Sequence, residues 1–184
     1  VDFPEGKTWM GYVDSRRLEI TCGEAPYLVS RYDAATGELI LPPLRRIGIL
    51  DRKLRIVDEN TASEEDWLKW TIRAFQASYG YEYQGDSLLI ARINLLMTFC
   101  DYYKERWGKR AETKLLKSIA NIISWNLWQM DGLKDTVPLG KPYEEYHQQT
   151  LFEYMEPEKE ASESVALPCR IFNWRSKESL LFKK

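Results

Sequence analysis

Histidine is nearly absent from the sequence and cysteine is scarce. His147 is the single histidine, and the three cysteines, Cys22, Cys100 and Cys169, are widely spaced. A zinc site needs a close set of Cys and His ligands, so no metal site is expected. An odd number of cysteines without a CxxC pair indicates reduced thiols, and we therefore expect a cytoplasmic protein. His147 lies in a polar, acidic stretch and is expected in a solvent-exposed loop.

Long apolar runs are also missing. The longest apolar-rich stretch, residues 88–99, is interrupted by Arg92, Asn94 and Thr98. No stretch approaches the roughly 18–20 apolar residues that a membrane span needs, and no signal-peptide pattern is visible. The sequence therefore predicts a protein that has no membrane partner.

Positive charge is not in excess. The 26 Lys and Arg residues are balanced by 28 Asp and Glu residues, which gives a net charge of −2. A domain that coats DNA on its own usually carries a large basic excess, so this balance argues against that class. It is compatible with a DNA enzyme whose target-reading region lies elsewhere.

Strand signals alternate with helix signals along the chain. Short strands are expected at about 18–23, 79–83, 126–130 and 169–172. Helices are expected at about 63–78, 88–107 and 111–124, with a last helix capped by Ser176. This alternation predicts an α/β fold with a mainly parallel sheet.

Capping and stop residues mark three of the expected helix ends. Ser63 precedes three acidic residues and is a good N-cap for the first of these helices. Asp86 or Ser87 is expected to cap the second helix, and Gly108 is expected to end it.

Residues from about 31 to 60 are expected to form a β-hairpin-like insertion. Short apolar stretches at 47–50 and 54–57 resemble strands, and Pro42-Pro43 breaks any regular element before them. The insertion carries a basic cluster composed of Arg45, Arg46, Arg52, Lys53 and Arg55. Such a cluster could contact DNA phosphates, although a solvated strand face is the more common explanation.

The stretch from about 134 to 166 is expected to be an acidic excursion from the fold. It holds seven glutamates and one lysine between residues 144 and 163, which is typical of a solvated surface segment. The chain begins with Val1 and ends in an element without a stop signal. We therefore expect both ends to be cut from a longer protein.

Three candidate site residues follow successive expected strands. Gly23 would let a ligand approach the backbone, Glu82 could accept hydrogen bonds from ribose hydroxyls, and Asp131 could accept one from the amine of adenine. Each alone is an ordinary feature: a tight turn, a surface carboxylate and an Asp-Gly turn. Because ligands bind at the carboxyl ends of parallel strands, their order together predicts a nucleoside site.

Three stretches resemble the S-adenosylmethionine motifs of N6-adenine DNA methyltransferases from bacterial restriction-modification systems. They are residues 18–27 (LEITCGEAPY), residues 79–86 (YGYEYQGD) continuing through 91–94 (ARIN), and residues 122–133 (IISWNLWQMDGL). The resemblance extends over residues 9–184 and includes the large enzymes that fuse a methyltransferase with an endonuclease. It implies a Rossmann-like methyltransferase sheet, incomplete here, in which residues 1–184 are the cofactor-binding part.

The resemblance also implies roles for single residues. Glu19 and the turn containing Cys22, Gly23 and Ala25 would lie beside the methionine and ribose parts of S-adenosylmethionine. Glu82 would bind the ribose hydroxyls, Tyr83 would flank the adenine ring, and Asp131 would bind the adenine amine. Double-stranded DNA would be bound by the complete protein, together with the remaining methyltransferase and target-recognition region.

The sequence departs from the family in two places. Ala25 stands where the first motif usually has a second glycine, and no Asn-Pro or Asp-Pro pair is present to begin the catalytic Asn-Pro-Pro-Tyr motif. The chain alone is therefore expected to be inactive. A non-catalytic split subunit or remnant that binds a partner is an alternative. Another nucleotide enzyme, such as a dehydrogenase, is disfavoured because the sequence has no GxGxxG.

Overall fold

Three short strands form a parallel sheet in the order β1-β2-β3. The strands are β1 (Arg17–Glu19), β2 (Ser78–Glu82) and β3 (Leu127–Gln129). The structure, a computed structural model, describes residues 3–138 and 167–182. Leu18 pairs with Tyr79 across β1 and β2, and Tyr81 pairs with Trp128 across β2 and β3. The predicted α/β class with a parallel sheet is therefore confirmed, and the arrangement is compatible with a Rossmann-like fold.

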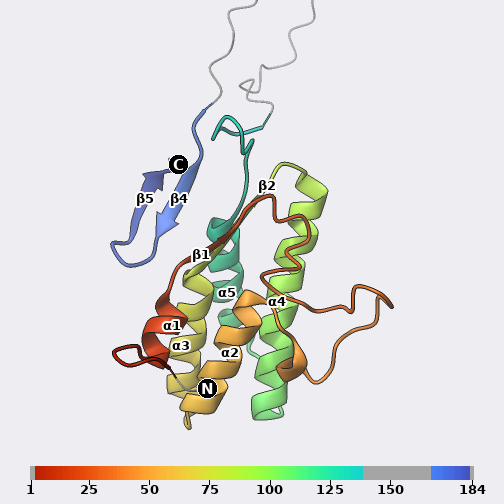
Figure 1. Ribbon diagram of the computed structural model, residues 1–184, viewed down its shortest axis with the longest axis vertical. Coiled ribbons are helices and arrows are strands. Elements are labelled where there is room, and N and C mark those ends of the chain that lie inside the picture. The colour runs from red at the N-terminus through yellow and green to blue at the C-terminus, as the bar shows by residue number, and fades with distance from the viewer. Residues whose placement is uncertain (1–2, 139–166, 183–184) are drawn as a thin grey trace, which may run out of the picture.

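Helical connections make the parallel pairing possible, because a parallel strand pair needs a long crossover. Helix α1 (Trp9–Asp14) precedes β1, helices α2 (Ile49–Asn60) and α3 (Glu64–Gln76) connect β1 to β2, and helices α4 (Gly85–Trp107) and α5 (Thr113–Asn126) connect β2 to β3. Figure 1 shows α2 to α5 side by side, with α3 and α5 running directly into β2 and β3.

The helix-end predictions are confirmed in two of three cases. Ser63 is the N-cap of α3 and accepts a hydrogen bond from the Asp66 N–H, and Gly108 ends α4 in the left-handed conformation. The N-cap predicted at Asp86 or Ser87 was wrong, because α4 already begins at Gly85.

The second half of the expected β insertion is a helix. Leu50, Leu54 and Val57 are fully buried on α2, at the i, i+4, i+7 spacing of one helix face. The short apolar stretches at 47–50 and 54–57 suggested strands. The helix forms instead because it buries these three apolar side chains on one face. In place of the expected hairpin, the first half of this region forms a single antiparallel bridge between Tyr32 and Leu39. A 3₁₀ turn, η1 (Pro43–Arg45), follows it.

The basic cluster of this region does not form one surface. Arg46 and Lys53 are almost completely buried, whereas Arg45 and Arg52 are exposed. Arg46 binds Asp101, and the Lys53 ammonium donates to two backbone carbonyls. Two of the five residues are therefore structural residues of the core, and for these two both the expected solvated face and a contact with DNA phosphates are ruled out by burial.

A second, antiparallel sheet covers the face of the parallel sheet that the helices leave open. It consists of β4 (Arg170–Asn173) and β5 (Glu178–Leu181). The strand predicted near residues 169–172 is confirmed, but among the described residues it pairs with β5 and does not join the parallel sheet. The helix predicted after Ser176 was wrong, because Lys177 adopts a positive φ of 58° in the hairpin turn and the chain reverses there.

Two apolar clusters lie on opposite faces of the parallel sheet. The larger cluster is formed mainly by the helices, together with residues of the loop after β1 and Leu127 of β3. The smaller one is formed by Tyr79, Tyr81, Trp128, Met130 and Cys169. Within the described residues, no helix combines the length and apolarity that crossing a membrane requires. Most of the predicted acidic excursion, including His147, lies outside the described residues.

Candidate nucleoside site at the carboxyl ends of the strands

The loop after β1 is hydrogen-bonded to the end of β2. The Gly23 N–H donates to Glu82 Oε2 over 2.7 Å, and the Cys22 N–H donates to the Tyr81 carbonyl over 2.8 Å. Two of the three predicted site residues, 59 positions apart in the sequence, are therefore in direct contact.

The Glu82 carboxylate is held by the backbone on both of its oxygens. Besides the Gly23 N–H on Oε2, Oε1 accepts from the Tyr83 N–H at 2.9 Å and the Gln84 N–H at 3.0 Å. A carboxylate has about four lone-pair positions, so acceptor capacity remains for a ligand hydroxyl. Glu82 is only partly buried.

Asp131 follows the neighbouring strand at the same edge. The Met130 N–H donates to the Glu82 carbonyl over 3.0 Å, which extends the β2–β3 ladder to the residue before Asp131. Asp131 Oδ1 accepts from the N–H groups of Leu133 and Lys134, as in an Asx turn. Asp131 Oδ2 has no hydrogen-bond partner among the described residues. The structure thus places Gly23, Glu82 and Asp131 along one edge.

The loop that carries Gly23 has an unusual backbone. Thr21, Gly23 and Ala25 all have positive φ, at 46°, 52° and 62°. Only glycine adopts this region without a steric cost, and strained backbone of this kind clusters at ligand-binding sites. The strain therefore supports a functional role for the loop.

Comparison with known proteins identifies no relative of this chain. The chain matches no protein-family model, no curated protein and no solved structure.

The buried side chains of Glu19 and Cys22 lie beneath the surface of the loop that follows β1. The Glu19 carboxylate is buried and accepts from the Tyr27 and Leu28 N–H groups, while its burial raises the pKa of Glu19. The Cys22 side chain is also buried, and this burial, together with the nearby carboxylates of Glu19 and Glu82, raises the pKa of the thiol to about 12. Both side chains face the protein interior, so the predicted contact of these residues with a cofactor would have to be made by their backbone.

Two polar side chains that the sequence did not assign to the site also hold it together. Asn94 Nδ2 on α4 donates to the Glu24 carbonyl over 3.1 Å, and Gln129 Nε2 on β3 donates to the Tyr83 carbonyl over 2.9 Å. Asn94 interrupts the apolar run of residues 88–99, and that interruption was the available signal. The described residues contain no group of three or more potential metal ligands.

Proposed function

We propose that this chain is the S-adenosylmethionine-binding portion of a site-specific DNA adenine-N6 methyltransferase of a restriction-modification system. The observation that carries the proposal is the hydrogen bond between Gly23 and Glu82, with Asp131 following the adjacent strand at the same edge. Ligands of parallel sheets bind at this edge.

The free acceptor positions fit the nucleoside part of S-adenosylmethionine. Glu82 retains capacity for a ribose hydroxyl, and Asp131 Oδ2 is open to the amine of adenine. Tyr83 is 44% exposed directly after Glu82, so its ring can flank a base. Ala25 turns its methyl group into the core, and only the backbone of the turn would meet the ligand.

The cofactor supplies an electrophilic methyl group on a sulfonium. The residues of this chain bind and orient it, so their contribution to the reaction is positioning. Recognition of a flipped adenine requires groups such as those of an Asn-Pro-Pro-Tyr motif, which the sequence lacks. Double-stranded DNA and the rest of the methyltransferase are therefore proposed partners, and the chain alone is proposed to be inactive.

A non-catalytic subunit is the alternative function. The missing Asn-Pro pair favours it, and so does exposed apolar surface on the edge strand β1 and the residue after it, where Leu18 is 41% and Ile20 is 63% exposed. A subunit of this kind would keep the fold without any affinity for S-adenosylmethionine.

Saturation-transfer NMR of the 184-residue chain with S-adenosylmethionine tests the proposal, because this method detects weak ligands. We expect a saturable signal with a Kd on the order of millimolar, since the sheet is small. The variant Asp131→Asn keeps an acceptor for the Asx turn but replaces the free oxygen with a donor, so it should weaken binding without unfolding the chain.

The matched control is Glu65→Gln, in the first turn of α3 and far along that helix from β2. Its signal should equal that of the unchanged chain. Absence of any signal, or equal signals from Asp131→Asn and the control, would contradict the proposal. Tight binding of NAD would replace it with a dehydrogenase-like function.

A further inference from the structure

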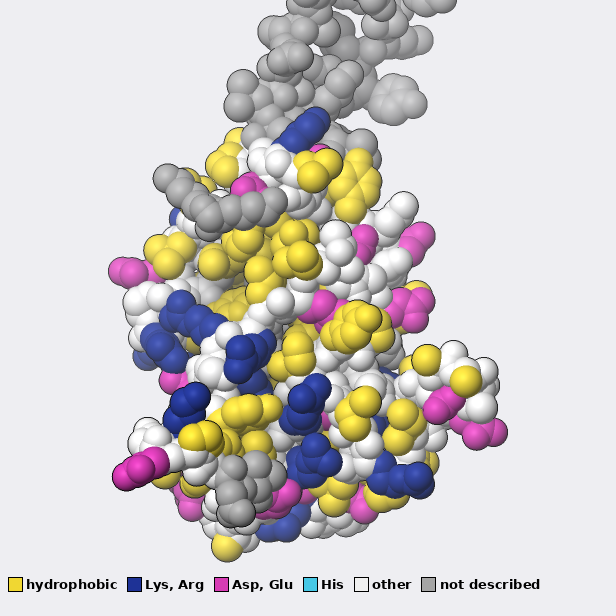
Figure 2. All heavy atoms as spheres, viewed as in Figure 1, with side chains coloured by type: hydrophobic (Ala, Val, Ile, Leu, Met, Phe, Trp, Pro, Cys, Tyr) yellow, Lys and Arg dark blue, Asp and Glu magenta, His cyan; other side chains and the backbone are white. Residues whose placement is uncertain are grey.

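A pocket of about 200 Å³ lies between the parallel sheet and the β4–β5 hairpin, and all five strands contribute to its walls. It lies against Leu18 and Tyr79, which pair with each other in the middle of β1 and early in β2. Figure 2 shows hydrophobic side chains gathered between the hairpin and the sheet, bordered below by Lys and Arg side chains. The pocket is thus separate from the edge formed by Gly23, Glu82 and Asp131.

The walls of the pocket are mainly apolar, and four of the lining side chains are aromatic. They include Tyr79, Trp128, Phe172 and Phe182, and the rings of Trp128 and Phe182 have centroids 5.5 Å apart. Leu180 in the wall is 42% exposed, so apolar surface remains open to solvent. Removing such surface from water would favour an apolar ligand.

The rim of the pocket is cationic. Arg16 and Arg17 line it and are exposed, and neither forms an ion pair within the part of the chain that the structure describes. Asp14, two residues before Arg16, is already paired with both Arg73 and Arg175.

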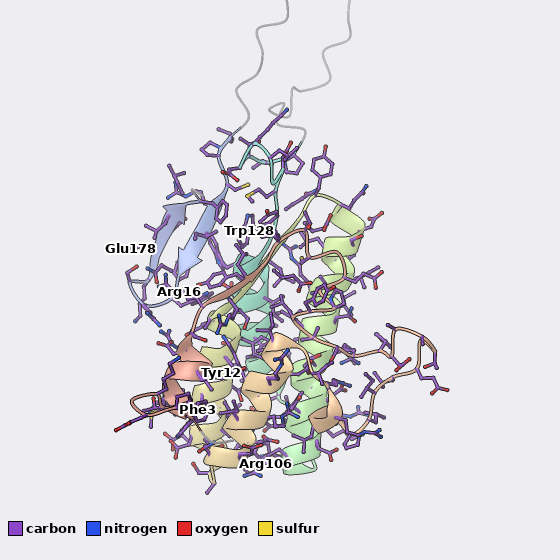
Figure 3. All side chains as sticks on the ribbon, in the orientation of Figure 1. Phe3, Tyr12, Arg16, Arg106, Trp128 and Glu178 are labelled. Atoms are coloured by element: carbon purple, nitrogen blue, oxygen red, sulfur yellow. The ribbon has the colours of Figure 1, made fainter. Side chains whose placement is uncertain are left out.

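The hairpin fixes part of this rim. Arg16 Nη2 donates to Asn173 Oδ1 over 2.9 Å, and Figure 3 shows Arg16 between α1 and the hairpin. The guanidinium is therefore held at the pocket while its other N–H groups stay available for an anion.

We propose that this pocket binds a small aromatic carboxylate, with the ring in the apolar interior and the carboxylate at Arg16 and Arg17. A cavity of roughly 150 Å³ accommodates benzene, so this one fits one ring or two fused rings. The planar fork of an arginine matches a carboxylate. This inference is independent of the proposed methyltransferase function.

Two matched probes, indole-3-carboxylate and its neutral amide, test the proposal. The indole N–H signals of the tryptophans are followed by ¹H–¹⁵N NMR, and the Trp128 signal is assigned with Trp128→Phe. We expect a saturable shift of the Trp128 signal with the carboxylate, and binding at least about fivefold weaker for the amide, because it lacks the charge.

Three variants locate the ligand. Arg17→Gln should weaken carboxylate binding about fivefold, whereas Arg45→Gln, an exposed arginine of η1, should leave it unchanged. Leu180→Trp should abolish binding by filling the pocket. Leu180 is partly exposed, so a larger side chain there is compatible with folding, and thermal melting of each variant confirms this.

Several outcomes would overturn the proposal. These are the absence of any saturable shift, equal affinity for the carboxylate and the amide, and equal effects of Arg17→Gln and Arg45→Gln. A concentration-dependent dimer that Leu18→Ser dissociates would instead assign the pocket to a second copy of the chain.

Discussion

Trp174 in the hairpin turn donates its indole N–H to Asn126 Oδ1 at the end of α5, over 2.7 Å. The amide of the same asparagine donates to the carbonyls of Phe75 and Ser78 over 2.9 and 3.0 Å. One buried side chain thus joins α3, β2, α5 and the hairpin, although these elements are distant in sequence.

The variant Asn126→Ala should lower the free energy of unfolding by about 2–4 kcal/mol. It leaves two buried carbonyls and a partly buried indole N–H without this partner, and each such loss costs up to about 1–3 kcal/mol before relaxation. Urea denaturation gives the value. Trp125→Phe is the control, since Trp125 is 38% exposed, and a similar loss in that variant would contradict the role of Asn126.

Replacing Asp101 should be among the most damaging changes to a charged residue. Its Oδ2 is bonded to Arg31 at 2.6 Å and to Arg46 at 2.7 Å, and both guanidiniums are buried. Asp101→Asn removes the carboxylate that forms an ion pair with both buried guanidiniums, at a cost of about 3–5 kcal/mol. Thermal and urea unfolding measure it, with the exposed Glu105→Gln on the same helix as reference. Equal stability of the two variants would refute this account.

The positive φ angles in the loop after β1 predict that substitutions at Thr21 and Gly23 change the unfolding free energy in opposite directions. Thr21 is exposed with φ 46°, so Thr21→Gly should raise the unfolding free energy by about 1 kcal/mol. Gly23 has φ 52° with nothing near its absent Cβ, so Gly23→Ala should lower it by about 1–2 kcal/mol through strain alone. Calorimetric melting measures both, and shifts in the same direction would show that the loop conformation is different.

Lys53 should make stability rise with pH above neutrality. Burial, together with the nearby cations Arg17 and Arg73 and opposed by Asp14, lowers the pKa of Lys53 to about 7. Between that pH and the unfolded value of 10.5, the unfolded chain binds the extra proton, so raising the pH favours the folded state. The slope from this residue is at most about 1.4 kcal/mol per pH unit.

Urea denaturation from pH 6 to 9.5 measures that slope. In Lys53→Met the corresponding rise should be lost, because the titrating group is gone. An unchanged pH profile in Lys53→Met would show that other groups cause the dependence.

Much of the site was predictable from local sequence. The turn at Gly23 and the acids at Glu82 and Asp131 were placed correctly at strand ends, because turn residues and short strands have local signatures. The supporting contacts of Asn94 and Gln129 were not predictable, since each joins residues far apart in the chain. The inward orientation of the Glu19 and Cys22 side chains was not predictable either, because it depends on tertiary packing.

The sequence by itself determined the alternation of strands and helices, the cap at Ser63 and the stop at Gly108, because each depends on neighbouring residues. Tertiary structure decided that residues 49–60 are a helix, that the hairpin forms its own sheet, and that Arg46 and Lys53 are buried. Each of these outcomes depends on contacts between segments that are far apart in the sequence. An apolar face is buried, and a charge is paired, only when a distant segment supplies the covering surface or the counter-charge. A local sequence pattern does not specify that segment.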